Sequence, residues 1–227
     1  GIDYVPASVE WADLDPTATA MALTTTDAAA RLPAAALSRT YDLYLDGFRR
    51  RRSGEMEWAS YTPYEIRSIG ALVRLGRREA AHELLESFLA DRRPRAWNQW
   101  PEIVWRDPKT PGHLGDLPHT WVAAEYVLAV LCLFAYERPT DSALVLAAGI
   151  PDAWLGGSHE VGIDDLPTYY GALSYSLRRG GDDTLRLSVW GELELPPGGI
   201  IIRPPLPRPL TASRSTERAS ITSTRGA

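Results

Sequence analysis

The sequence has little cysteine, little phenylalanine and no long apolar run. Cys132 is the one cysteine in 227 residues, so an intrachain disulfide and a zinc site built on cysteines are both excluded. The absence of disulfides leaves the cellular compartment open. No stretch is apolar and long enough to span a bilayer, so we expect no membrane partner.

Short motifs of several large enzyme classes are also missing. The sequence has no GxSxG elbow, no P-loop, no GxGxxG after a strand and no HExxH. His113 has no second ligand at metal spacing. We therefore expect neither a cofactor nor a metal.

The charge balance is acidic, with a formal net charge of -5 and a pI of about 5.4. This argues against broad nucleic-acid binding, which needs a basic face, and against electrostatic attachment to anionic lipid. Tryptophan and tyrosine are frequent, with 8 and 10 copies beside 3 phenylalanines. Rings with a polar edge suit surfaces that are partly wet, such as carbohydrate clefts and interfaces.

The first half of the sequence predicts helical hairpins. Helical periodicity and capping residues predict helices over residues 16–24, 33–52, 62–75, 77–91 and 118–136. Asp15 is the expected cap of the first, and Thr62 with Glu65 forms a capping box for the third. The fifth is apolar nearly all round, which predicts a helix buried on most sides.

A long loop, residues 93–118, separates the last two predicted helices and is rich in Pro, Gly and Trp. Four tryptophans between positions 97 and 121 argue against disorder, so the loop is expected to be functional.

The sequence pattern changes after Arg138, where short segments of alternating apolar and polar residues predict strands. They cover residues 144–146, 168–177, 185–195 and 200–202. The expected organisation is a helical-hairpin region over 1–137, a small β-rich segment over 138–206 and a disordered tail over 207–227.

Two segments of the long loop resemble (α/α)6-barrel carbohydrate enzymes, the glucoamylases and their clan relatives. They are Pro101-Glu102 and the run Gly-Asp-Leu-Pro-His-Thr-Trp-Val-Ala-Ala at 115–124. Large bacterial barrel proteins, some with discoidin-type sugar-binding modules, are similar at residues 13–19, 61–65, 149–151 and 166–171. The resemblance covers residues 1–205 and implies a mainly α fold, a partial (α/α)6 helical-hairpin barrel with a C-terminal antiparallel β segment.

In that family the loop glutamate is the general base of an inverting hydrolysis, and the resemblance implies this role for Glu102. Glucoamylases hold the general acid on further upstream hairpins, which this chain is too short to contain. The first residues, Gly1 to Pro6, have no initiator Met and no polar lead-in, so we expect the natural protein, or an ancestor of it, to extend further N-terminally. We also expect an exposed apolar patch, with self-association or a need for the missing half.

Inverting glycoside hydrolysis needs two carboxyl groups roughly 6.5–9.5 Å apart, one protonated and one ionised. Glu102 stands between two tryptophans, although an ion pair with Arg95 or Arg106 is the structural alternative. Asp13 or Glu10 is the candidate acid, and solvation is the alternative for both.

Further side chains are candidate contacts to a sugar. Asp116 and Glu65 have helix capping as their alternative role, and Tyr61 has core packing. The complete set of substrate candidates is Trp97, Trp100, Trp105, Asp116, His119, Trp121, Trp11, Tyr61 and Glu65.

Two functions are compatible with these features, both with an oligo- or polysaccharide as partner. The first is the C-terminal portion of an inverting glycoside hydrolase with Glu102 as base. The second is a non-catalytic carbohydrate-binding or protein-interaction fragment of such a barrel. A second carboxylate across an open cleft from Glu102 favours the first, and Glu102 buried against an arginine favours the second. The sugar, the linkage, the general acid and the choice between hydrolysis and phosphorolysis stay open.

Overall fold

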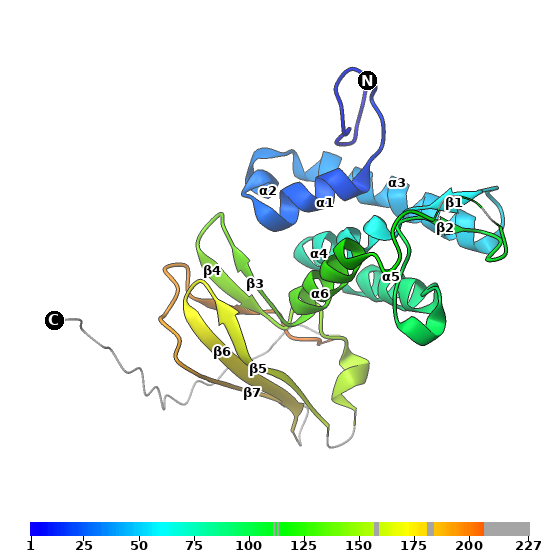
Figure 1. Cartoon of the computed structure of the whole chain (residues 1–227). Coiled ribbons are helices and arrows are strands. Elements are labelled where there is room, and N and C mark those ends of the chain that lie inside the picture. Colours follow the sequence, from blue (N-terminus) through cyan, green and yellow to red (C-terminus); the bar gives the residue numbers. More distant parts are fainter. Residues whose placement is uncertain (111, 113, 157–158, 181–183, 207–227) are drawn as a thin grey trace. The chain divides into compact units, whose positions relative to one another are not determined.

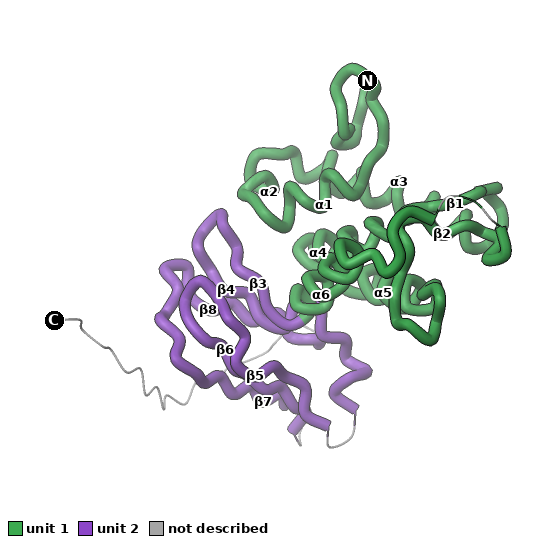
Figure 2. The backbone as a smooth tube through the Cα atoms, viewed as in Figure 1, with its two compact units in different colours: residues 1–133 green, residues 134–227 purple. Residues whose placement is uncertain are grey.

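The computed structural model describes residues 1–110, 112, 114–156, 159–180 and 184–206. The chain forms two compact units, residues 1–133 and 134–227 (Figure 2). The predicted tail at 207–227 lies outside the described residues.

The first unit is mostly helical (Figure 1). Its described elements are α1 (Pro16–Thr25), α2 (Ala28–Arg31), α3 (Ala34–Ser53), β1 (Ser60–Tyr61), the 3-10 turn η1 (Pro63–Ile66), α4 (Arg67–Arg74), α5 (Arg78–Ala90), the 3-10 turn η2 (Arg95–Trp97), β2 (Val104–Trp105) and α6 (Thr120–Phe134).

The predicted signals for α1 and α3 are confirmed. The Asp15 carboxylate accepts the backbone N–H groups of Thr17 at 2.8 Å and Ala18 at 3.3 Å, so it caps α1. Gly54 ends α3 in the left-handed conformation with φ of 85°. The apolar stripe of α3 is buried along its length, at Leu37, Tyr41, Tyr44, Leu45 and Phe48.

The capping box predicted for the third helix is wrong in one half. The Thr62 hydroxyl accepts the Tyr64 N–H at 3.4 Å, as expected, and a 3-10 turn rather than an α-turn follows. The Glu65 carboxylate does not return to the Thr62 backbone but accepts from Tyr44 and Arg51. A charged partner on α3 outcompetes the local cap because a carboxylate hydrogen-bonded to guanidinium is the stronger interaction.

α4 lies at the centre of the helical unit and packs against α1 and α5. Its side chains Ile69, Ala71, Leu72 and Val73 are all fully buried. At Gly70 an added Cβ would lie 3.2 Å from Thr24 Cγ2 and 3.4 Å from Cys132 Sγ, so α1 and α6 both approach α4 closely there.

The expectation that α6 is buried on most sides is wrong. Trp121, Val127 and Leu128 are 63%, 52% and 57% exposed, whereas Val122 and Leu133 are buried. One face of α6 therefore packs and another apolar face does not. An exposed apolar patch was expected, but whether it drives self-association stays a prediction.

The second unit is built from strands. Its described elements are β3 (Ala135–Arg138), β4 (Ala143–Leu146), the 3-10 turn η3 (Asp152–Leu155), β5 (Glu160–Thr168), β6 (Gly171–Arg179), β7 (Leu185–Trp190) and β8 (Ile200–Ile202). One sheet has the order β3-β4-β8, with β4 parallel to β8, and the other is the antiparallel sheet β5-β6-β7. The predicted hairpin is present as β6 and β7, and its turn at 181–183 lies outside the described residues.

Both sheets contribute to a single core. Leu144 and Leu146 of β4 and Leu173, Tyr175 and Leu177 of β6 are buried in one apolar cluster. Gly162 of β5 allows the close approach of β6, because a Cβ there would lie 2.0 Å from the Tyr175 carbonyl oxygen.

The predicted mainly α class is wrong. Over the residues that the structure describes, the protein is 41% helical and 20% strand with three small sheets, which makes it a mixed α/β protein. Strand pairing within the long loop, as β2 with β1, was not foreseen. The predicted fifth helix also stops at Phe134, and its last residues form β3 against β4.

Candidate functional site

The long loop is fastened to the segment before α4, and this fixes the backbone of Glu102. β2 pairs with β1 in the register Ser60 to Trp105 and Tyr61 to Val104. The Thr62 hydroxyl donates to the Glu102 carbonyl oxygen at 3.2 Å. The segment of residues 60–62 therefore determines where the loop glutamate lies.

The side chain of Glu102 lies directly against Gly115. A Cβ at position 115 would come within 2.1 Å of Glu102 Oε2 and 2.4 Å of its Cβ, and φ at Gly115 is +69°. Only glycine fits this backbone conformation without strain while leaving room for the carboxyl group. The two segments that carry the family resemblance thus meet at this contact.

The Glu102 carboxylate has no hydrogen-bond or ion-pair partner over the described ranges. The alternative pairing with Arg95 or Arg106 is not formed. The Arg95 guanidinium donates instead to the Ala90 carbonyl oxygen at 3.3 Å. The part-buried carboxylates of Glu65 and Glu125 both have arginine partners. Glu102, in contrast, is half-buried and has no arginine partner among the described residues.

Tyr64 and His119 form a polar pair, and the charge of Glu102 acts on Tyr64. The Tyr64 hydroxyl lies 2.7 Å from His119 Nε2, and the His119 side chain is mostly buried at 9% exposure. When the hydroxyl donates, Nε2 accepts and Nδ1 carries the proton. Nδ1 then faces Asp116 Oδ2 at 4.0 Å, beyond direct hydrogen-bond range.

The Trp121 and Tyr64 rings make a T-shaped contact, with centroids 6.0 Å apart and an interplanar angle of 88°. The Trp121 indole is 63% exposed, so a face is open to solvent. Asp116 has a side chain that is 90% exposed and, within the described chain, accepts no backbone N–H of α6. The capping role considered for Asp116 is therefore not observed.

Arg67 also belongs to this group, and its guanidinium packs against the Tyr64 ring. Its guanidinium lies 4.5 Å from the ring centroid and pairs with Glu125 of α6 at 2.8 Å. Burial raises the pKa of Tyr64. Arg67 opposes this effect, and the charges of Glu102, Glu125 and Asp116 add to it. Tyr64 consequently keeps its hydroxyl proton at neutral pH.

We define the Glu102 cluster as Tyr64, Arg67, Glu102, Gly115, Asp116, His119, Trp121 and Glu125. The sequence predicted Glu102, Asp116, His119 and Trp121 as site residues, and the structure brings these four together. It did not predict Tyr64, Arg67 or Glu125. Their spacings, i to i+3 for Tyr64 and Arg67 and i to i+4 for Trp121 and Glu125, place each pair on one helix face.

Asp13 and Trp11 lie apart from this cluster in the N-terminal loop. The Asp13 carboxylate accepts the Ser8 N–H at 3.0 Å, and Trp11 is 82% exposed. No described contact joins either residue, or Glu10, to Glu102.

The three loop tryptophans have different surroundings. Trp100 is 3% exposed, its indole N–H donates to the Phe88 carbonyl oxygen at 2.8 Å, and its ring contacts Tyr126. Trp105 covers Gly112, where an added Cβ would lie 2.5 Å from the indole. Trp97 is 59% exposed in η2.

Glu65 and Tyr61 belong to a second, separate network. Glu65 pairs with Arg51 at 2.6 Å and accepts the Tyr44 hydroxyl at 2.8 Å. The Tyr61 hydroxyl donates to Asp91 at 2.8 Å, and Arg51 lies 4.7 Å from the Tyr61 ring centroid. Burial raises the pKa of both tyrosines.

The part of the chain that the structure describes contains no group of three or more His, Cys, Asp or Glu side chains arranged to hold a metal ion. Nor does any helix among the described residues have the length and apolar character needed to cross a membrane. Comparison of the chain with protein-family models, with curated proteins and with solved structures finds no match.

Proposed function

We propose that the Glu102 cluster is a carbohydrate site and that Glu102 acts there as the general base of an inverting glycoside hydrolysis. One observation carries the proposal: the Glu102 carboxylate has no protein partner among the described residues, although Gly115 and the Thr62 contact hold it in place. A positioned carboxylate without a cation is available to accept a proton from water.

The neighbouring groups suit a sugar. The Tyr64 hydroxyl and the His119 imidazole donate and accept hydrogen bonds, as sugar hydroxyls require. The exposed indole of Trp121 offers an apolar surface beside these polar groups, the combination that a pyranose ring needs.

In the proposed step, Glu102 takes a proton from water as the water oxygen bonds to the anomeric carbon. The glycosidic bond breaks, and a general acid gives a proton to the departing oxygen. Such an acid needs an environment that keeps it protonated, whereas the Asp116 side chain is 90% exposed. The exposed Asp116 carboxyl therefore does not suit the role of the acid. The proposal names Glu102 as the base and no residue as the acid.

The second candidate is a non-catalytic carbohydrate-binding module that uses the same cluster. It is favoured by the placement of Asp13, whose carboxylate is engaged in the N-terminal loop rather than near Glu102. Binding needs only Tyr64, His119 and Trp121, whereas inverting hydrolysis needs two carboxyl groups at a fixed separation.

The test is turnover and binding of an oligosaccharide panel by the full chain, the Glu102→Gln variant and Glu86→Gln. Glu86 is an exposed carboxylate of α5 and serves as the matched control. Reducing-end release reports turnover, added inorganic phosphate detects phosphorolysis, and tryptophan fluorescence reports binding.

We expect Glu102→Gln to lose turnover by a factor of about 10² to 10⁴ while binding persists, and Glu86→Gln to match the wild type. Binding without turnover in all three proteins would support the binding module. Turnover that is equal in Glu102→Gln and the wild type would overturn Glu102 as the base. The absence of both activities would overturn the carbohydrate proposal.

A further inference from the structure

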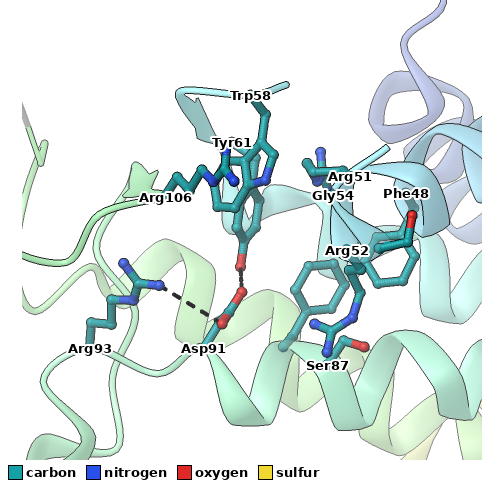
Figure 3. Close-up of a pocket in the computed structure, with 12 residues that line it drawn as sticks. Phe48, Arg51, Arg52, Gly54, Trp58, Tyr61, Ser87, Asp91, Arg93 and Arg106 are labelled. Carbon is teal, nitrogen blue, oxygen red and sulfur yellow. Dashed lines mark hydrogen bonds and ion pairs between the residues drawn. The ribbon is translucent and has the colours of Figure 1, made fainter. Parts of the chain in front are cut away.

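A cavity of about 400 Å³ lies in the helical unit, beyond the end of α3 (Figure 3). Its walls are aromatic side chains from three segments, namely Phe48, Trp58, Tyr61 and Phe88. This volume falls in the range of sites for small molecules. None of the lining residues belongs to the Glu102 cluster, so a ligand of this cavity is independent of the proposed carbohydrate function.

Four arginines and a single aspartate line the same cavity. Two of the arginines are neutralised. Arg51 pairs with Glu65 at 2.6 Å, and Arg93 lies 3.9 Å from Asp91, which also accepts the Tyr61 hydroxyl. Figure 3 shows Arg93 directed at Asp91.

The other two, Arg52 and Arg106, have no carboxylate partner in the described part of the chain. Arg52 lies 5.8 Å from the Phe48 ring centroid, and the nearby carboxylate of Glu83 is already paired with Arg49 at 2.6 Å. The Arg106 backbone is fixed by its N–H bond to the Ala59 carbonyl oxygen at 2.9 Å.

The cavity is therefore cationic in a protein whose net charge is -5. In Figure 3, Arg93 and Arg106 lie on one side of the Tyr61–Asp91 pair and Arg52 on the other. A ligand between Arg52 and Arg106 would meet their two guanidinium groups and an aromatic wall. Guanidinium groups bind carboxylate and phosphate through paired hydrogen bonds, and aromatic side chains favour a ring.

We propose that this cavity binds a small molecule in which a carboxylate or phosphate group is attached to a ring. Arg52 and Arg106 supply the positive charge that attracts the oxyanion, and the ring packs against Trp58 and its aromatic neighbours. Tyr61 and Asp91 form the polar floor of the cavity, and the Asp91 carboxylate accepts a hydrogen bond from the Tyr61 hydroxyl there.

The experiment titrates the full chain with four probes and follows the heat of binding. Phenyl phosphate and benzoate carry an oxyanion on a ring, benzyl alcohol carries the ring without charge, and inorganic phosphate carries the charge without the ring. We expect phenyl phosphate or benzoate to bind at least tenfold more tightly than benzyl alcohol and inorganic phosphate, with affinity that falls as salt is added. The stronger of the two ring probes identifies the oxyanion.

Variants locate the binding. Arg52→Gln and Arg106→Gln should each weaken the ring-bearing anion about tenfold or more, because each removes a charged hydrogen-bond donor. Arg50→Gln makes the same charge change on α3 outside the cavity and should leave affinity unchanged within about twofold. Equal binding of benzyl alcohol, or an equal loss in Arg50→Gln, would overturn the proposal. So would the absence of binding by both ring-bearing anions at millimolar concentration.

Discussion

At the residue scale, Gly115 sets the position of the Glu102 carboxylate. Replacing Gly115 with alanine adds a Cβ that overlaps Glu102 Oε2, in a conformation with positive φ that alanine rarely adopts. The carboxyl group must move, and a displacement of about 1 Å can lower a reaction rate about 10²-fold. We expect Gly115→Ala to weaken sugar turnover or binding at least tenfold, measured on the same oligosaccharide panel.

Gly47→Ala is the control for this change. Gly47 lies in α3 with its nearest neighbour, Met56 Cε, 3.9 Å from an added Cβ, so alanine fits there. It should leave sugar binding unchanged and raise the free energy of unfolding by up to about 1 kcal/mol. Equal losses in both glycine variants would contradict the specific role of Gly115.

Arg51 and Glu65 form a mostly buried ion pair, with side chains 16% and 11% exposed. Arg51→Met leaves the Glu65 carboxylate without its cation and should lower the free energy of unfolding by roughly 3 kcal/mol. The double variant Arg51→Met/Glu65→Leu should recover part of this loss, because the unpaired charge is then absent. Urea unfolding measures both, and a double variant as unstable as the sum of the two single variants would refute the coupling.

The residue scale also shows how far the site was predictable. Glu102 was predicted from the family resemblance, and Asp116, His119 and Trp121 were predicted from their residue types at the start of the fifth helix. Tyr64 and Arg67 were missed because they join the cluster only when η1 and the start of α4 lie beside α6. No local pattern encodes that proximity.

At the element scale, the start of α1 depends on Asp15. Its carboxylate accepts two backbone N–H groups and the Thr17 hydroxyl. Asp15→Ala should lower the free energy of unfolding by about 1 kcal/mol, whereas Asp15→Asn keeps an accepting oxygen and should lose much less. Thermal unfolding followed by circular dichroism measures the difference, and equal losses in the two variants would exclude capping as the cause.

Elements with local signals were predictable, and elements made by distant pairing were not. α1 and α3 have a cap, a stop and a buried stripe within their own residues, so their positions were predicted within one or two residues. β2 exists because Val104 and Trp105 pair with β1, more than 40 positions earlier. β3 likewise replaces the last turn of a predicted helix because β4 supplies its hydrogen bonds.

At the scale of the whole molecule, three buried tyrosines make the helical unit sensitive to alkali. Burial raises the pKa of Tyr41, Tyr44 and Tyr61 above the ordinary value of 10.0. Above about pH 10 the unfolded state loses these protons while the folded state keeps them, so stability falls as pH rises. The expected slope is about 1.4 kcal/mol per pH unit for each tyrosine.

Urea unfolding at several pH values between 9 and 11.5, with tyrosinate absorbance as the second probe, tests this prediction. Tyrosinate from these side chains should appear together with unfolding. Ionisation of all ten tyrosines near pH 10 with the fold intact would show that the three hydroxyls are not protected.

The mixed α/β class is also a property of the whole molecule, because it results from two units of different composition. The two units have separate cores, one of helices around α4 and one between two sheets. Helical periodicity dominates the first 134 residues and favoured a mainly α class, but the strands of the second unit are too extensive for it.

Whether the Glu102 cluster holds a sugar is tested most simply by a fluorescence titration of the full chain with the oligosaccharide panel. We expect saturable binding that Trp121→Ala weakens about tenfold or more and Trp97→Ala leaves unchanged, since both indoles are exposed but only Trp121 adjoins Tyr64. Absence of saturable binding, or equal effects of the two substitutions, would contradict a sugar site at the Glu102 cluster.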